Sequence, residues 1–345
     1  SVTDGANNTT SYGFNAAGDP ISTTHPDGTQ ATATFDEAGR QTGTSDLSAT
    51  GTVLRSGSAA YDGDGDLVSS TDYRGNATTF TYGATGLLTQ EVQPVTATTS
   101  VTTSFGYDAA GNQTLYTDGN TNKWWTTYTP WNQPASMTEP STAQYSTAAN
   151  TTFTNSYDAD GRPVTQAQPG GVSVTNAFDS MGRLTGQSGS GASAVTAPRS
   201  FGYNLGGDMT SASTGAAGSR PATSESFTYN DRGMVLTASG TAGSSTFSYN
   251  GDGQVTSVAD AAGTTGYGYD SAGRLAQLTD PATGTTLSYG YNSLSQVSQV
   301  SYGSGGNTRS FGYNSLHQLT SDTLATHAGA SVASISYGYD LNGNL

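Results

Sequence analysis

Aromatic and polar positions recur along the chain with a regular period. An aromatic residue is followed by Asp or Asn, two variable residues and usually Gly, and this phrase occurs fifteen times. The anchoring aromatics are Phe14, Phe35, Tyr61, Tyr82, Tyr107, Tyr128, Tyr157, Phe178, Tyr203, Tyr229, Tyr249, Tyr269, Tyr291, Tyr313 and Tyr339. Their spacings run from 20 to 29 residues, and a period of about 20 to 50 residues is typical of a repeat architecture. The pattern predicts a single array of about fifteen repeats over residues 1–345.

Alternation within each repeat predicts two strands. Most repeats carry a second aromatic two residues before the first, as in Phe105 and Tyr107. A two-residue period places both rings on the same face of a strand. Six residues after the anchoring aromatic, ten repeats carry an aliphatic residue or Met that predicts the inward face of a returning strand. These residues are Leu67, Leu88, Leu184, Met209, Val235, Val255, Leu275, Val297, Leu319 and Leu345.

The residues between the two strands predict a tight turn. Asp or Asn at the first position and Gly at the fourth are typical of a type I turn. Followed by a left-handed Gly, such a turn makes a hairpin loop with a bulge. The structural positions are represented by Tyr61-Asp62, by Tyr107-Asp108 with Gly111, by Tyr157-Asp158 with Gly161, and by Tyr269-Asp270 with Gly273, Arg274 and Leu275. Arginines that follow the Gly, namely Arg40, Arg162, Arg183 and Arg274, are expected to stack on Tyr rings or pair with the repeat Asp.

These units predict an all-β fold with essentially no helix. No stretch shows the sustained i, i+3, i+4 apolar spacing of a helix, and the chain has 46 Gly. Fifteen hairpins imply roughly thirty strands, more than an open sheet usually carries before it curls. We therefore expect tandem hairpins in one continuous spiral β-sheet, either a ribbon or a shell. Since exposed edge strands pair readily with other chains, the two ends are expected to be covered by more protein.

Composition narrows the partners. The net charge is −15, with Lys123 as the one lysine and ten arginines scattered singly. Neutralising phosphates requires clustered basic residues, so nucleic acid is not expected as a partner. No apolar run is long enough to span a membrane, so membrane insertion is not expected either. Residues 1–5 lack the basic and apolar regions of a signal peptide, which predicts a mature or excised segment. The chain has no cysteine, which excludes disulfides and thiol chemistry.

Three alternating carboxylates form a candidate calcium loop. They are Asp62, Asp64 and Asp66. An EF-hand loop needs Gly at its sixth position and Glu at its twelfth, whereas this segment has Leu67 and Tyr73 there. Because the segment coincides with a repeat turn, turn chemistry without any cofactor is the favoured interpretation, and calcium binding is the alternative.

The tryptophans mark a candidate binding surface. Trp124, Trp125 and Trp131 surround Tyr128 in the most irregular repeat. Exposed Trp is favoured at binding hot spots and can stack on sugars or partner side chains. Large rings can equally fill a corner or the inside of the sheet. Both interpretations stay open from the sequence.

The histidines give little support to an enzyme. His25, His317 and His327 are the three in the chain, and His317 stands where a repeat usually has Gly, which predicts a turn residue. A zinc site or a Ser-His-Asp triad needs convergent partners that the sequence does not bring together. We therefore expect no catalytic site.

The phrase resembles the YD repeat of the Rhs family, which is also found in teneurins and in the C component of insecticidal toxin complexes. The closest copies run over residues 267–275 and 178–184, and the resemblance covers about residues 12 to 345. It implies a long β-ribbon wound into a hollow shell. In Rhs-like relatives the shell encloses a C-terminal toxin domain, and in teneurins it presents binding surfaces outside the cell.

Two departures limit what the resemblance carries over. The chain stops inside a repeat at Leu345, and it lacks both the Pro- and Asp-rich core motif and a non-repeat domain. Cleavage and toxicity are therefore not expected of this chain, which is expected to be a segment of a larger shell. The expected function is a non-enzymatic scaffold in a secreted or cell-surface bacterial protein. Its expected partners are further repeats or capping domains, other copies, or an enclosed toxin domain. The alternative is a self-assembling filament or an adhesive, glycan-binding module.

Overall fold

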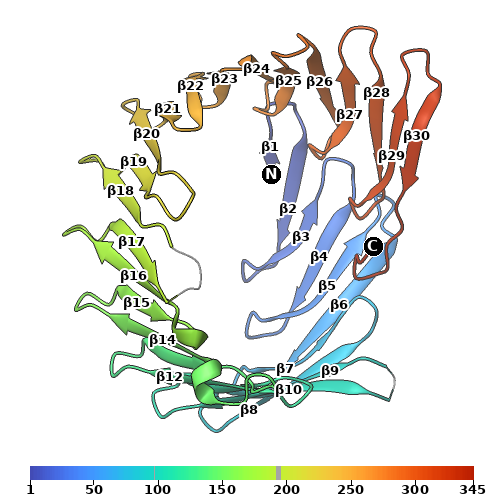
Figure 1. Cartoon of the computed structure of the whole chain (residues 1–345). Helices are drawn as coiled ribbons and strands as arrows, with labels where there is room; N and C mark the ends of the chain where they lie inside the picture. Colours follow the sequence, from blue (N-terminus) through green and yellow to red (C-terminus); the bar gives the residue numbers. More distant parts are fainter. Residues whose placement is uncertain (97, 192–195) are drawn as a thin grey trace.

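The described residues form one antiparallel sheet of 30 strands (Figure 1). The computed structural model describes residues 1–96, 98–191 and 196–345. Within these residues the helical elements are two 3-10 turns, η1 (Ala148–Asn150) and η2 (Pro169–Gly171). Neither approaches the length and apolar character of a membrane-spanning helix, and the described part of the chain has no other candidate. The expected all-β fold is confirmed.

The strand bounds show the short, even elements of a repeat array. The first half contains β1 (Val2–Thr3), β2 (Thr9–Phe14), β3 (Pro20–Thr24), β4 (Gln30–Phe35), β5 (Gln41–Leu47), β6 (Val53–Tyr61), β7 (Leu67–Thr71), β8 (Ala77–Tyr82), β9 (Leu88–Pro94), β10 (Ser100–Tyr107), β11 (Gln113–Thr117), β12 (Lys123–Tyr128), β13 (Pro134–Thr138), β14 (Thr152–Tyr157) and β15 (Pro163–Ala167). The second half contains β16 (Ser173–Phe178), β17 (Leu184–Ser190), β18 (Arg199–Tyr203), β19 (Met209–Thr214), β20 (Thr223–Tyr229), β21 (Val235–Gly240), β22 (Gly243–Tyr249), β23 (Val255–Asp260), β24 (Gly263–Tyr269), β25 (Leu275–Thr279), β26 (Thr286–Tyr291), β27 (Val297–Tyr302), β28 (Thr308–Tyr313), β29 (Leu319–Ala325) and β30 (Ser331–Ser336).

Every strand pairs with its neighbours in sequence, so the sheet is a continuous meander. Fourteen of the anchoring aromatics are the last residue of a strand that pairs with the next strand, as Tyr107 is for β10 and β11. In each of these hairpins the register shifts immediately before the aromatic, as between Gly106 and Tyr107. This shift is the predicted bulge. Tyr339 follows the last strand and begins a turn of the same kind.

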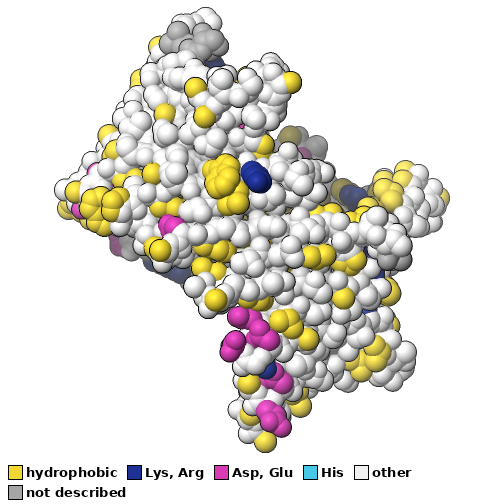
Figure 2. Space-filling view, turned by 90° about the horizontal axis from the view of Figure 1, so that it is seen from below, with side chains coloured by type: hydrophobic (Ala, Val, Ile, Leu, Met, Phe, Trp, Pro, Cys, Tyr) yellow, Lys and Arg dark blue, Asp and Glu magenta, His cyan; other side chains and the backbone are white. Residues whose placement is uncertain are grey.

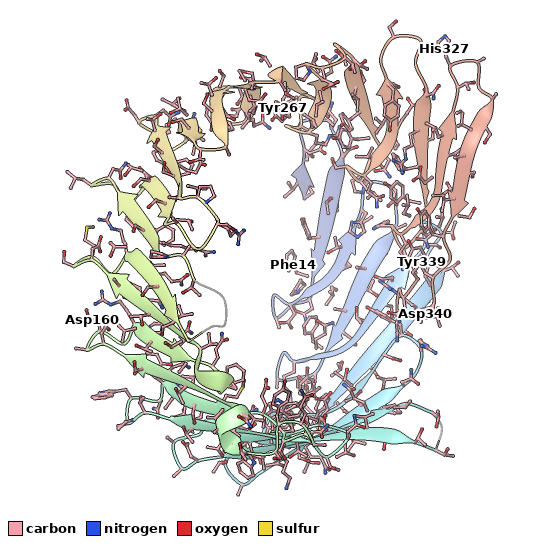
Figure 3. All side chains as sticks on the ribbon, in the orientation of Figure 1. Phe14, Asp160, Tyr267, His327, Tyr339 and Asp340 are labelled. Carbon is pink, nitrogen blue, oxygen red and sulfur yellow. The ribbon has the colours of Figure 1, made fainter. Side chains whose placement is uncertain are left out.

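The sheet is a single layer with two different faces. Phe14 and Tyr267 belong to the face with the repeat aromatics and lie on the inner side of the curl (Figure 3). The opposite face carries Ser, Thr and Gly, and its hydroxyls pair across strands, as do those of Thr228 and Thr237 at 2.7 Å. The surface seen from below is largely uncharged, with scattered hydrophobic side chains (Figure 2). Hardly any apolar side chain of the described residues is buried, so strand pairing and ring packing replace a conventional two-layer core.

The sheet curls until its late turns lie against its first loops (Figure 1). Ser271, in the turn after β24, donates a hydrogen bond of 2.8 Å to the carbonyl oxygen of Gly5, 266 positions earlier. Asn342 reaches Asp72, 270 positions earlier, at 2.7 Å. Because the chain passes over its own beginning, the predicted continuous spiral is confirmed.

Candidate functional site

The repeat turns have one geometry, which the segment after Tyr107 illustrates. The amide of Gly111 donates to the carbonyl oxygen of Asp108 at 3.1 Å, and the amide of Asp108 donates to that of Asn112 at 3.0 Å. One carboxylate oxygen of Asp108 accepts from the amides of Ala110 and Asn112 at 2.9 Å each. The equivalent carboxylates of Asp62, Asp158 and Asp270 accept in the same way. The predicted role of the repeat Asp as a turn acceptor is therefore observed.

The carboxylates of Asp108 and Asp72 are held in their charged form. The Asn112 side chain and then its amide donate to Asp108 and lower the pKa of that carboxyl. Hydrogen bonds from the side chains of Asn76 and then Asn342 lower the pKa of Asp72 to about 2. A carboxylate that accepts several hydrogen bonds is a poor proton acceptor at neutral pH. The observed role of these groups is to accept the hydrogen bonds of the turn.

The fourth turn position adopts a left-handed backbone. Gly111 has φ +86° and Gly273 has φ +76°. Three repeats place another residue there, and these are Asn132, Ser295 and His317, with φ between +60° and +63°. Non-Gly residues are strained in this region. The prediction that His317 is a turn residue is confirmed, and its side chain has a further role described below.

The hydroxyl of each repeat tyrosine joins two successive repeats. It donates to the carbonyl oxygen of the residue six positions after the preceding anchoring aromatic, as Tyr107 does to Leu88 at 2.8 Å and Tyr269 does to Val255 at 2.8 Å. The same bond is made by Tyr61, Tyr82, Tyr128, Tyr157, Tyr203, Tyr229, Tyr249, Tyr291, Tyr313 and Tyr339. The sequence pattern placed the rings on one face of a strand but did not predict a role for the hydroxyls. The available signal was the preference for Tyr over Phe at twelve of the fifteen positions.

One repeat replaces the hydroxyl with an amide. Phe178 has no hydroxyl, and the side chain of Asn176, two residues earlier on β16, donates to the carbonyl oxygen of Pro163 at 2.9 Å. Pro163 stands six positions after Tyr157, so the acceptor is the one that a tyrosine would use. The contact between successive hairpins is thus kept by a different residue.

The residue after the turn glycine links neighbouring turns. Arg183 donates from Nε to Asp179 at 2.8 Å and from Nη1 to the carbonyl oxygen of Asn204 in the next turn at 2.9 Å. Its guanidinium also lies 4.8 Å from the ring centre of Tyr203. Arg40, Arg162 and Arg274 likewise pair with their repeat Asp and stack on the next aromatic. The predicted pairing with the repeat Asp is observed for all four, and the predicted stacking on Tyr for three of them, whereas Arg162 stacks on Phe178. Where Gln replaces Arg, its amide reaches the next turn instead, as Gln254 does with Gly273.

Of the three carboxylates in the candidate calcium loop, that of Asp62 accepts the turn hydrogen bonds. Asp62 accepts from the amides of Asp64 and Asp66 at 3.0 and 2.9 Å. No group of three or more His, Asp or Glu side chains in the described ranges is arranged to hold a metal ion. The observed geometry is that of the favoured turn interpretation.

The structure separates the three tryptophans. Trp124 and Tyr128 share the aromatic face, where the Trp124 ring packs 5.3 Å from that of Tyr116. Trp125 lies on the opposite face beside Lys123 and is 50% exposed. Trp131 is in the following turn and is 81% exposed. Trp124 therefore fills space inside the curl, and the outward aromatic surface of the strand is Trp125.

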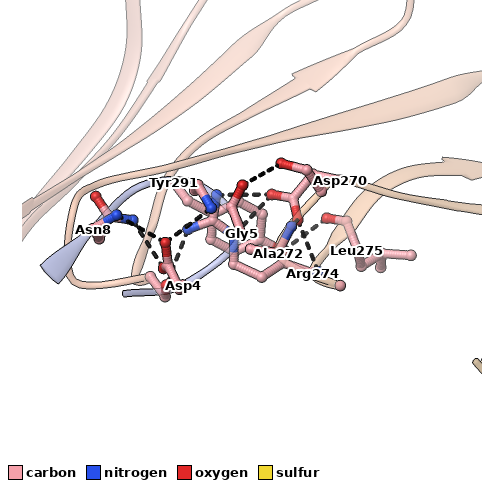
Figure 4. A network of polar contacts seen from close by, with 12 residues as sticks. Asp4, Gly5, Asn8, Asp270, Ala272, Arg274, Leu275 and Tyr291 are labelled. Atoms are coloured by element: carbon pink, nitrogen blue, oxygen red, sulfur yellow. Dashed lines mark hydrogen bonds and ion pairs between the residues drawn. The ribbon is translucent and has the colours of Figure 1, made fainter. Parts of the chain in front are cut away.

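The meeting of the two ends forms a seam, which we define as residues 4–8, 25–29, 55 and 72–74 together with residues 270–274, 315–317 and 340–342. Figure 4 shows its first part, where Gly5 lies against the turn after Tyr269. A Cβ atom at Gly5 would lie 2.1 Å from the carbonyl oxygen of Ser271, so the close approach requires glycine. Hydrogen bonds from the side chain and amide of Asn8 lower the pKa of Asp4, with a smaller contribution from the charge of Arg274 across the seam.

The last part of the seam fixes the number of repeats per turn of the spiral. Asp340 pairs with Arg74 at 3.4 Å, and the carbonyl oxygen of Leu341 accepts from Arg55 at 3.4 Å. These late residues follow the fifteenth anchoring aromatic, Tyr339, whereas Arg74 lies in the loop after the hairpin of the third, Tyr61. One turn of the spiral therefore takes about twelve repeats.

Comparisons with known proteins agree with this geometry. The family model described as RHS Repeat matches residues 61–98, 229–265, 249–285 and 269–306. The crystal structure of TcdB2-TccC3-TEV matches with a TM-score of 0.65 at 16% identity, covering 98% of this chain and 21% of that chain. The crystal structure of TcdB2-TccC3-Cdc42 has a TM-score of 0.46 at 14% identity, covering 96% and 23%. The structure of the Photorhabdus luminescens Tc holotoxin pore with a mutated TccC3 has a TM-score of 0.45 at 15% identity. The match covers 96% of this chain and 23% of that chain. No curated protein matches the chain.

The fold and the repeat turns define a class, an open antiparallel ribbon of hairpins wound into a spiral. The TM-score of 0.65 shows that TcdB2-TccC3-TEV shares this fold. The chain spans about a fifth of the length of that solved chain, of which the match covers 21%. Residues 61–98 and 229–306 match the RHS Repeat model, which bears out the resemblance to the Rhs and YD-repeat family.

Proposed function

We propose that the chain is a non-enzymatic scaffold that forms part of the wall of a hollow shell. The observation that carries the proposal is the seam, since Asn342 and Asp72 meet after one turn of about twelve repeats. A repeat array whose units contact only their neighbours can grow by adding units. Further repeats or capping domains would therefore lengthen the spiral. The turn carboxylates are engaged in hydrogen bonds, which supports a structural rather than a catalytic role.

The inner face supports a role in enclosing or displaying a polypeptide. Aromatic rings such as Phe14 line the inside of the curl (Figure 3), and Phe14 is exposed. A sheet face with apolar rings is usually covered by another layer. A toxin or effector domain of the same protein would provide that cover. Secretion or surface attachment by a bacterium is part of the proposal and rests on the family resemblance.

A protease-protection experiment tests the enclosure. A short, unstructured passenger is fused after Leu345, and its lifetime under protease is compared between the wild type and Asp72→Ala/Asn342→Ala, which removes the seam bond. The same passenger on a long Gly/Ser linker, which lets it leave the curl, is the control. We expect the passenger to last longest in the directly fused wild type. Equal lifetimes in all three proteins would contradict enclosure.

A second candidate function is binding of an anionic glycan on the outer face. Trp125 is half-exposed there, and Lys123, the one lysine in the chain, is two residues away on the same face. The hydroxyl pairs Thr127–Ser136 and Thr138–Thr152 flank them. The Trp125 ring could stack on a sugar, Lys123 could pair with a carboxylate, and the hydroxyls could hydrogen-bond to the sugar. These groups together suit a polysaccharide that carries carboxylates.

Trp125→Ala tests this second function. We expect it to abolish co-sedimentation with a uronic-acid polymer while the melting temperature changes little, because half of the Trp125 side chain is exposed. Trp131→Ala, which removes an equally large exposed ring from the turn edge, is the matched control and should bind normally. Equal binding by both variants and the wild type would exclude the site.

A further inference from the structure

The histidine at a glycine position reaches across the seam. His317 has φ +63°, and its Nε2 lies 2.9 Å from Thr29 Oγ1 and 3.4 Å from Asp27 Oδ2. Thr29 is 288 positions earlier in the sequence. The ring of His25 lies 5.1 Å from that of His317 at an angle of 88°, edge to face. The turn gains nothing from an imidazole at a left-handed position, so these seam contacts are what the side chain contributes.

The hydrogen bonds fix one proton on His317. Thr29 is buried, at 5% exposed, and its hydroxyl donates its one hydrogen to Asp27 Oδ1 at 2.7 Å. Its oxygen is then an acceptor toward His317, so Nε2 must carry a hydrogen. The neutral imidazole and the imidazolium both satisfy this bond. Only the imidazolium adds an ion pair with Asp27.

The charges around His317 come from three places. His25 and Asp27 lie in the loop between β3 and β4, and Asp46 on β5 and Arg55 on β6 line the same pocket. Asp46 and Arg55 pair with each other at 2.6 Å and largely cancel. The net charge facing His317 is therefore that of Asp27. Partial burial opposes this charge, but hydrogen bonds from Thr29 and the nearby His317 and His25 outweigh it and lower the pKa of the Asp27 carboxyl.

We propose that His317, His25 and Asp27 form a proton-controlled latch that holds the seam more tightly as the pH falls from about 8 to 6. One proton added to the pair of imidazoles creates the ion pair with Asp27. A second proton would put like charges on two rings whose centres are 5.1 Å apart, which opposes further tightening. The latch depends on the seam alone and not on what the wall encloses.

The direction of the effect on the seam at lower pH depends on the protonation of Asp27. Its folded-state pKa is lowered, so its charge contributes stability above the unfolded pKa of about 3.9, and this contribution is lost as the pH falls through the folded value. The imidazolium–carboxylate pair therefore weakens below about pH 4. The seam is tightest at mildly acidic pH.

Distance measurement across the seam tests the latch. Ala49→Cys and Ser315→Cys place spin labels on exposed residues of the two sides, in a chain without other cysteines. From pH 8 to pH 6 we expect the ratio of closed to open forms to rise about two- to fivefold, the effect of one partly exposed ion pair. His317→Gly restores the residue of most other turns and should abolish the response without lowering the melting temperature. Asp27→Asn should also abolish it.

His327→Gln is the matched control. His327 lies in the turn after β29, away from the seam (Figure 3), and its replacement should leave the response intact. A pH response that persists in His317→Gly would overturn the proposal. So would a wild-type distance distribution that does not change between pH 8 and pH 6.

Discussion

At the scale of single residues, the side chains that matter most are those that tie one hairpin to the next. The hydroxyl of Tyr107 donates to Leu88 in the preceding repeat, and the guanidinium of Arg183 reaches Asn204 in the following one. Few apolar side chains of the described residues are buried, so these polar contacts carry a larger share of the stability than they would in a two-layer domain.

The repeat that lacks the hydroxyl gives a test at this scale. Asn176→Ala removes the hydrogen bond to Pro163 and the 3.1 Å bond that Asn176 Oδ1 accepts from Gln187, and it should lower the free energy of unfolding by about 1–2 kcal/mol. Asn155→Ala is the matched control, because its acceptor, Pro134, keeps the 2.7 Å bond from Tyr157 and little stability should be lost. Urea unfolding followed by tyrosine fluorescence measures both. Equal losses would mean that the amide does not replace the tyrosine.

At the scale of the elements, the turn is the most strictly determined part of each hairpin. Its Asp or Asn accepts from two amides, and its fourth residue has a positive φ. The bulge before the aromatic follows from this geometry. Because the same turn recurs, the strands stay in register over the whole sheet.

A glycine substitution tests the turn. Gly111→Ala should lower the free energy of unfolding by about 1–2 kcal/mol, because φ is +86° there, although the added methyl would meet only Leu87 at 3.9 Å. Gly251→Ala is the control, since that glycine lies outside the left-handed region and has open space around it. Thermal unfolding of both variants measures the difference. A stable Gly111→Ala protein would contradict the assigned turn.

Much of the hairpin structure could be predicted from the sequence, because the residues that determine each turn and strand lie close together in the chain. The turn of Asp108 and Gly111 and the paired role of Arg183 follow from residues a few positions apart. The period of a strand also separates Trp124 from Trp125, since neighbouring residues face opposite sides. The acceptor of the Tyr107 hydroxyl could not be predicted, because it depends on how successive hairpins lie against each other.

At the scale of the whole molecule, the defining feature is the seam. The position of the seam depends on the curvature that accumulates over about twelve hairpins. No short stretch of sequence predicts this total curvature. Two residues of the seam stand out in the structure: Gly5, where a backbone approaches closely, and His317, whose side chain reaches Thr29 from a turn position that is usually glycine. Both acquire meaning once the two ends are seen side by side (Figure 1).

The central claim is that the ribbon passes over its own start after one turn, and cross-linking tests it most directly. Asp72→Cys/Asn342→Cys replaces two side chains that are 2.7 Å apart in a chain without cysteine. A short bifunctional thiol reagent at high dilution should link them within one molecule. The control pair Asp160→Cys/Asn342→Cys should not link, because Asp160 lies on the opposite side of the curl from Asp340, two residues before Asn342 (Figure 3). Mass spectrometry that finds no intramolecular link between positions 72 and 342 would contradict the spiral.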